Sequence, residues 1–259
     1  MRHLEQELVT LRQDIIDMWK LVISQVANSG EAILSFDKEL ATKVSMREKK
    51  VDAYELKIDS ECENIIALHQ PVAVDLRFVL AVLKINSNLE RIADFAYGIS
   101  RVLITYPSVI LDAEIIVDTK LNEMIGQVNK MLSQGLEAFE NEKSEMATAI
   151  FSEDYIVDEI NVNATRIIAD YIQKNPDRAF ECLHMIAAIR KLERIGDHCS
   201  NIAEEIFFYL DAKVLKHSPK KWVLWLYNDK EFVLWNMNKE VNQHLIYLFD
   251  VFIIDVSSI

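Results

Sequence analysis

Four pairs of acidic residues, each with a spacing of four, are the part of this sequence best suited to chemistry. Residues four apart lie one above the other on the same face of a helix. Carboxylate oxygens are the ligands of magnesium and manganese, and bridging carboxylates also hold iron or zinc. The pairs are Glu48 with Asp52, Glu90 with Asp94, Asp154 with Asp158, and Glu193 with Asp197. The sequence therefore predicts binding of divalent or trivalent metal ions, with the choice among these four left open.

The pairs are placed symmetrically about two prolines. Asp52 lies 19 residues before Pro71, and Glu90 lies 19 residues after it. The corresponding residues of the second copy lie 18 and 17 residues from Pro176. If antiparallel helices meet at each proline, the four carboxylates of a copy come level, roughly 28–35 Å from the turn. Level carboxylates repel one another unless protons or cations intervene, so we expect two metal sites.

The second predicted site has one further candidate ligand. Asn201, one helical turn beyond Asp197, offers a carbonyl oxygen, whereas Gly98 stands at the matching position of the first copy. The alternative interpretation is a solvated surface, because Glu193 and Asp197 point away from the apolar stripe of their helix and outward carboxylates are usually solvated. The symmetry of four pairs favours ion binding, in an exposed groove and not in a buried active site.

Long helices must position these residues. Apolar residues recur at helical spacing, and the 259 residues include only 5 Gly and 4 Pro. We predict helices at 3–36, 40–69, 72–105, 112–141, 145–174 and 176–211, with the first break near either 28–30 or 36–37. Asn175 is expected to cap the last helix, ahead of Pro176. Helices of this length joined by short loops predict an all-α fold built of bundles.

An internal repeat divides the chain. Segments 88–94 and 191–197 agree at five of seven positions and lie 103 residues apart. We therefore predict two tandem, pseudo-symmetric three-helix units at 1–106 and 107–217. The remaining segment, 218–259, contains three of the four tryptophans and has no counterpart in the first unit. Its role is left open among a packing element, a membrane- or partner-seeking tail, and a sequence foreign to the fold.

The composition of the chain limits the classes of partner that we expect it to bind and the compartment in which we expect it. A formal net charge of −13 argues against nucleic acid or an anionic membrane as the main partner. Three cysteines without a CxxC pair, a charged N-terminus and no apolar run of about 18 residues predict a cytoplasmic protein without a membrane span. The sequence contains no HExxH motif, glycine-rich phosphate loop or nucleophile elbow, so no catalytic residue is predicted.

Two stretches resemble the PhoU family of phosphate-uptake regulators. Residues 193–204, ERIGDHCSNIAE, are similar to the family signature, and residues 70–77, QPVAVDLR, resemble its other recurrent stretch. The resemblance covers about residues 3–217. It implies two three-helix bundles side by side, with surface metal clusters held through E(D)xxxD motifs at the four acidic pairs. Ala93, Phe95 and Gly98 depart from the signature in the first copy.

The resemblance also implies a regulator and not an enzyme. Such a protein would restrain phosphate import and phosphate-starvation signalling by binding the sensor histidine kinase and the ATPase subunit of the phosphate ABC transporter. We further expect a homodimer. Two alternatives stay open: a carboxylate-bridged metalloenzyme, such as an oxidase or phosphohydrolase, and a plain helical scaffold that holds no metal.

Overall fold

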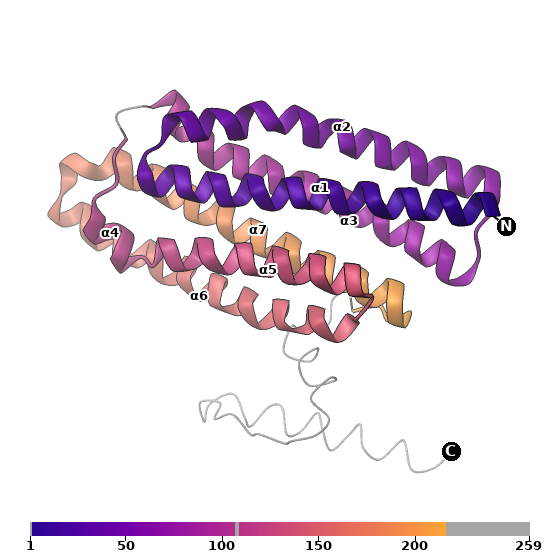
Figure 1. Cartoon of the computed structure of the whole chain (residues 1–259). Helices are drawn as coiled ribbons and strands as arrows, with labels where there is room; N and C mark the ends of the chain where they lie inside the picture. The colour runs from indigo at the N-terminus through magenta and orange to yellow at the C-terminus, as the bar shows by residue number, and fades with distance from the viewer. Residues whose placement is uncertain (1, 107–108, 216–259) are drawn as a thin grey trace, which may run out of the picture. The chain divides into compact units, whose positions relative to one another are not determined.

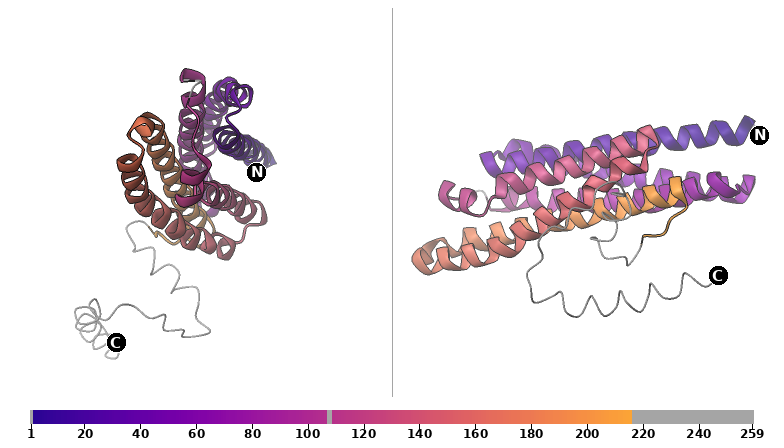
Figure 2. Two further views of the ribbon diagram at one scale, coloured as in Figure 1. Left: turned by 90° about the vertical axis from the view of Figure 1, so that its left-hand side faces the viewer. Right: turned by 90° about the horizontal axis from the view of Figure 1, so that it is seen from below.

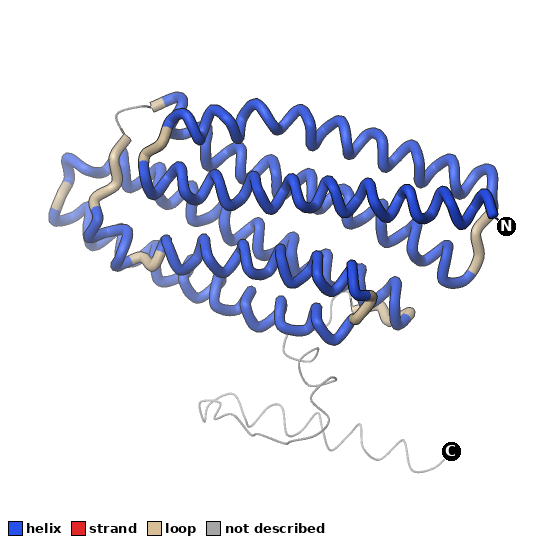
Figure 3. The backbone as a smooth tube through the Cα atoms, viewed as in Figure 1, coloured by secondary structure: helices blue, strands red, loops and turns tan. Residues whose placement is uncertain are grey.

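Long helices account for most of the chain that the computed structural model describes, which is residues 2–106 and 109–215 (Figures 1 and 3). The predicted tail at 218–259 lies outside the described residues. The elements are α1 (Arg2–Ser35), α2 (Lys38–His69), α3 (Ala73–Thr105), α4 (Ala113–Asp118), α5 (Leu121–Asn141), α6 (Ser144–Lys174), η1 (Pro176–Arg178) and α7 (Ala179–Asp211).

The first helix break falls at Phe36 and Asp37, which settles the choice left open by the sequence. Helix α1 continues through residues 28–30 and ends at Ser35. Phe36 then adopts a left-handed conformation with φ of 58°. Asp37 begins α2, because its Oδ1 accepts a hydrogen bond from the backbone N–H of Leu40 at 2.9 Å. This is the acidic side-chain cap that a helix N-terminus favours.

Two local predictions were wrong. The helix expected at 112–141 is broken into α4 and α5, because Lys120 turns the backbone to a positive φ of 55°. Asn175 makes no side-chain cap; its Nδ2 instead donates to the carbonyl oxygen of Tyr171 at 3.3 Å. Pro176 nevertheless opens the short 3-10 turn η1, where a missing backbone N–H costs nothing.

The helices form two bundles, which confirms the predicted all-α fold. Helices α1, α2 and α3 pack against one another, and α5, α6 and α7 do the same. The bundles meet where α3 lies along α7 and where α1 contacts α5, as the views in Figure 2 show. Helix α4 packs on α5 and α6. Each acidic cluster therefore sits on a pair of packed helices, α2 with α3 and α6 with α7.

One apolar core runs through both bundles. Trp19 of α1 is fully buried, and its Nε1 donates to the carbonyl oxygen of Leu132 in α5 at 3.1 Å. Its ring packs against Phe139, with ring centroids 5.9 Å apart. A buried indole needs such a partner for its N–H. The indole thus ties the first bundle to the second.

The turn at Pro71 sets the register of α2 against α3. Helix α2 ends at His69, and Gln70 follows in a left-handed conformation with φ of 47°. Pro71 is buried, and α3 starts two residues later. A tight turn brings residues equally distant from it to the same level of two antiparallel helices. None of the helices within the described ranges is long and apolar enough to cross a membrane.

Candidate functional site

The second copy's acidic residues converge on one point between α6 and α7. Asp154, Asp158 and Asp197 each offer a carboxylate oxygen, and these three atoms lie within 4.8 Å of one another. Glu193 lies beside them, since the pKa of its carboxyl is raised first by burial and then by the negative charges of Asp197, Asp158 and Asp154. The α6 and α7 acidic pairs therefore form the cluster that their spacing predicted.

Asp154 is fully buried, whereas Glu193 and Asp197, which were predicted to point outward, are partly exposed. Two features of α7 accommodate Asp154. The hydroxyl of Ser200 donates to Asp154 Oδ2 at 2.8 Å. Gly196 leaves room for the other oxygen, because a Cβ atom at this position would lie 2.9 Å from Asp154 Oδ1. The absence of a side chain at Gly196 is thus a requirement of the cluster's geometry.

The first copy's four acidic residues also face one another, from α2 and α3. Burial raises the pKa of Glu48, and the charges of Asp52 and Asp94 raise it further. Burial also raises the pKa of Glu90 to about 7, with the charge of Asp94 as the next cause. Among the described residues, these four do not form a three-oxygen group as compact as that of the second copy.

Glu55 belongs to the first cluster, although sequence reasoning did not select it. Its pKa is raised by burial and then by the charges of Asp59, Asp52 and Asp94. The signal was available: Glu55 lies three residues beyond Asp52 and continues the same helical face. The second copy has Asn161 at the matching position. The first cluster therefore contains one more carboxylate than the second.

An arginine lies at the exposed edge of each cluster. In α3, Arg91 Nε lies 3.5 Å from a carboxylate oxygen of Glu90. In α7, Arg194 Nε lies 3.8 Å from the equivalent oxygen of Glu193. Both guanidinium groups also approach the aspartate of their pair at 3.8 Å. Both arginines are mostly exposed, so they neutralise the clusters only in part.

Two of the three residues that depart from the family signature, Phe95 and Gly98, lie at the contact of α3 with α7. A Cβ atom at position 98 would lie 2.7 Å from Cε of Lys191, so Gly98 makes room for that side chain. The ring of Phe95 packs against His198, with centroids 5.7 Å apart. Gly98 and Phe95 therefore serve the contact between the bundles.

The same contact holds the residues around Asn201. His198 Nδ1 lies 2.7 Å from Asn88 Oδ1 across the interface. Asn201 is exposed, and its Nδ2 lies 3.5 Å from the same Asn88 oxygen. A ligand role for the Asn201 carbonyl oxygen stays a prediction.

The three cysteines are poorly suited to act as nucleophiles, because all of them are buried. All three are free and buried, and burial raises the pKa of Cys62 to about 12. Burial also raises the pKa of Cys199 well above its ordinary value. A cysteine nucleophile needs a lowered pKa. These thiols are therefore apolar core groups at neutral pH.

A family model described as the PhoU domain matches residues 15–103 and 121–206 of the chain. The two matches contain all four acidic pairs, two in each. A "Phosphate-specific transport system accessory protein PhoU homolog" of Zymomonas mobilis is 32% identical over 209 residues, covering 81% of this chain and 87% of the relative. The homolog of Caulobacter vibrioides is 35% identical over 218 residues, covering 83% and 93%.

Solved structures are similar as well. The crystal structure of PhoU from Pseudomonas aeruginosa is 32% identical in sequence and superposes with a TM-score of 0.77, covering 81% of this chain and 99% of that one. The phosphate transport system regulatory protein PhoU of Streptococcus pneumoniae superposes with a TM-score of 0.73 over 82% of this chain and 98% of that one. It is 24% identical and supports the fold alone.

Proposed function

The chain belongs to the PhoU family, and on that premise we propose that it is a non-enzymatic, cytosolic regulator of phosphate uptake and phosphate-starvation signalling. The names of its relatives support the transport part of this function, since they describe accessory proteins of phosphate-specific transport systems. The match extends over 93% of the Caulobacter relative, so nearly the whole accessory protein has a counterpart here.

The protein acts, in this proposal, by binding partner proteins as a homodimer. The partners are the phosphate-sensing histidine kinase and the ATPase subunit of the phosphate ABC transporter. Family membership supports this assignment. The strong acidity of the chain, with a net charge of −13, favours protein partners over nucleic acid. The two repeats, at 1–106 and 107–217, are proposed as the structural units of the regulator.

Metal ions at the acidic clusters are the second part of the proposal. The convergence of Asp154, Asp158 and Asp197 within 4.8 Å is the observation that carries it. The oxygen-only donor set fits magnesium or manganese, and iron or zinc where carboxylates bridge. Asp158, Glu193 and Asp197 would hold the ion with Asp154 at its buried side. A bound cation would offset the mutual repulsion of the carboxylates and link α6 to α7.

The double substitution Glu193→Ala and Asp197→Ala tests the two parts together. The tagged wild-type protein and the variant are recovered from phosphate-replete cells, and metal content and bound proteins are measured for both. We expect the wild type to retain metal and to carry the kinase and the ATPase subunit. Unchanged metal in the variant would defeat the metal assignment, and the absence of both partners from the wild type would defeat the regulatory one.

The two alternatives make different predictions in the same preparations. A carboxylate-bridged metalloenzyme would turn over substrate when loaded with metal, and it would need an acid–base group in a pocket. A plain helical scaffold would bind its partners equally well after complete removal of metal by a chelator. Turnover assays on the metal-loaded protein and partner binding by the chelated protein separate these outcomes.

A further inference from the structure

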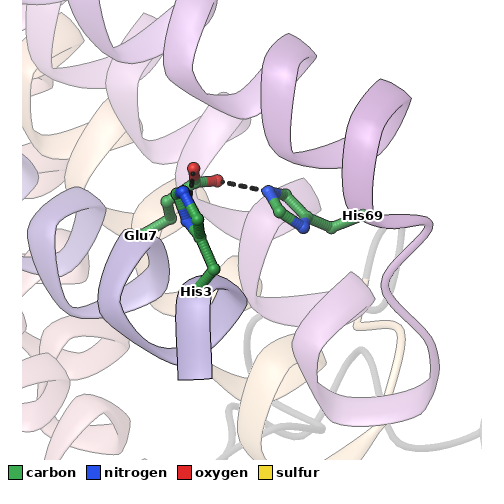
Figure 4. Close-up of side chains that lie close together, drawn as sticks. All are labelled: His3, Glu7 and His69. Atoms are coloured by element: carbon green, nitrogen blue, oxygen red, sulfur yellow. Dashed lines mark ion pairs between the residues drawn. The ribbon is translucent and has the colours of Figure 1, made fainter. Parts of the chain in front are cut away.

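A cluster of two histidines and a glutamate, separate from the acidic pairs, lies where α1 begins and α2 ends. His3 lies in the first turn of α1, Glu7 one turn later, and His69 is the last residue of α2. Figure 4 shows both imidazole rings approaching the Glu7 carboxylate, one from each helix. One ligand atom from each residue lies within 4.8 Å of the other two.

The distances within this cluster suit a small metal ion. His69 Nε2 lies 2.8 Å from one oxygen of Glu7, and His3 Nδ1 lies 3.1 Å from the other. The two rings are 5.6 Å apart at their centroids and inclined by 38°. Zinc bonds to nitrogen and oxygen are about 2.0–2.1 Å long, so ligand atoms of a tetrahedral site lie about 3.3 Å apart. Both imidazole–carboxylate distances are thus already close to the ligand spacing of a tetrahedral site.

We propose that His3, Glu7 and His69 form a third metal site, which takes a divalent transition-metal ion such as zinc. Two imidazole nitrogens with one carboxylate are a donor set that zinc and iron use in sites with an open coordination position. The acidic quartets offer oxygen alone and suit harder cations. The two kinds of site therefore differ in the donor atoms that they offer to a metal ion, and this proposal does not depend on the proposed function.

The surroundings leave room for the open position. Glu7 borders a cavity of about 230 Å³, whose other lining residues are Thr10, Glu61, Asn64 and Ile65. Side-chain exposure falls from 78% for His3 to 30% for Glu7 and 22% for His69. A water molecule or a partner's side chain can therefore reach the ion. The other two protein ligands, Glu7 and His69, are more buried than His3.

A bound ion would have a mechanical consequence. The contacts at this end of the bundle include the His69–Glu7 ion pair, which requires a protonated imidazole. A neutral imidazole is the form that binds metal. Zinc would thus link the first turn of α1 to the last turn of α2 through neutral imidazoles, without the protonated form that the ion pair requires.

Cobalt and zinc titrations test the site. The chain is prepared without a histidine tag, stripped with a chelator and titrated with Co²⁺ at pH 7.5, then with Zn²⁺. Because tetrahedral Co²⁺ absorbs visible light far more strongly than octahedral Co²⁺, we expect an intense band that Zn²⁺ abolishes. Glu7→Gln and His69→Gln should lose that band and bind one equivalent of Zn²⁺ fewer than the wild type.

Two controls make the result specific. His184→Gln removes a histidine that packs against Phe180 and Tyr106, and it should keep the band and the full zinc stoichiometry. The Glu193→Ala and Asp197→Ala variant should also keep the band, which separates this site from the acidic cluster. The exposed His3→Gln variant, with helicity checked by circular dichroism, guards against loss of fold. An unchanged spectrum and stoichiometry in His3→Gln and Glu7→Gln would overturn the proposal.

Discussion

The two acidic clusters share a charge pattern but differ in how closely their helices let the carboxylates gather. In the second copy, Gly196 allows the short, buried side chain of Asp154 to lie against α7. The first copy has Ala93 in place of this glycine and the longer Glu48 in place of the aspartate. The two copies of the motif thus keep the same charges, but the residue that faces them, Gly196 or Ala93, determines how closely the carboxylates can approach one another.

The clusters also differ in what surrounds the carboxylates. The second has the Ser200 hydroxyl, which donates to Asp154, whereas the first has Tyr97 at the matching position. The first has the additional carboxylate of Glu55, and the pKa of Glu90 is raised to about 7. We therefore expect the second cluster to bind a cation more tightly and the first to bind protons near neutral pH.

The largest expected effect is loss of the ion from one cluster alone. Glu193→Ala with Asp197→Ala removes half of the second quartet and should abolish metal retention there, measured by elemental analysis of the purified protein. Glu90→Ala with Asp94→Ala is the matched change in the first copy and should remove less metal. The melting temperature of the metal-free second-copy variant should stay within about 4 °C of the wild type, because partly exposed carboxylates contribute little to stability. Equal metal loss from both variants would remove the distinction between the clusters.

Exchange of the small residues tests the role of the backbone. Gly196→Ala places a Cβ atom against Asp154 Oδ1 and Val157, at 2.9 and 3.3 Å in the present geometry. We expect at least a tenfold loss of metal affinity at the second cluster, by isothermal titration calorimetry. Helicity should be retained, because alanine favours a helix by about 1 kcal/mol over glycine. Ala93→Gly is the reciprocal control and should leave the metal affinity of the second cluster unchanged. An undiminished metal affinity in Gly196→Ala would contradict the prediction, because it would show that the Asp154 side chain can move away from the new Cβ atom.

Protons should stabilise the metal-free first cluster. The folded-state pKa of Glu90 is raised to about 7 from an ordinary value of 4.5, so the folded protein binds more protons than the unfolded chain between these values. Stability therefore falls as pH rises through this window. In chelator, the melting temperature of the wild type should fall between pH 5.5 and 8 by more than that of Glu90→Gln. Parallel curves for the two proteins would contradict the raised pKa.

The smallest effect is expected at the contact between the bundles. Gly98→Asn copies the Asn201 side chain of the second copy into the first, yet Lys191 occupies that space. We expect no gain in metal binding at the first cluster, and a decrease in stability of about 1 kcal/mol measured by urea denaturation. The double variant Gly98→Asn with Lys191→Ala should recover most of the stability, because it removes the crowding. A gain of metal in the single variant would contradict this prediction, because it would mean that the Lys191 side chain moves away at little cost in free energy.

Most of the fold followed from the sequence, because long amphipathic helices with few glycines and prolines leave few alternatives. The helix pairs and the level of the quartets were predictable from spacing about Pro71 and Pro176. The break at Lys120 was not, since a left-handed lysine carries no local signal such as glycine would give. Within the sites, the burial of Asp154 depends on a contact with Gly196 in another helix, which periodicity along one helix cannot reveal.

The indole of Trp19 has a consequence for the order of folding during synthesis. Its hydrogen-bond acceptor, Leu132, lies 113 residues further along the chain. While the first three helices emerge from the ribosome, the Trp19 indole has neither this acceptor nor its ring contact with Phe139. The surroundings that Trp19 has in the folded protein are therefore complete only after α5 has been synthesised.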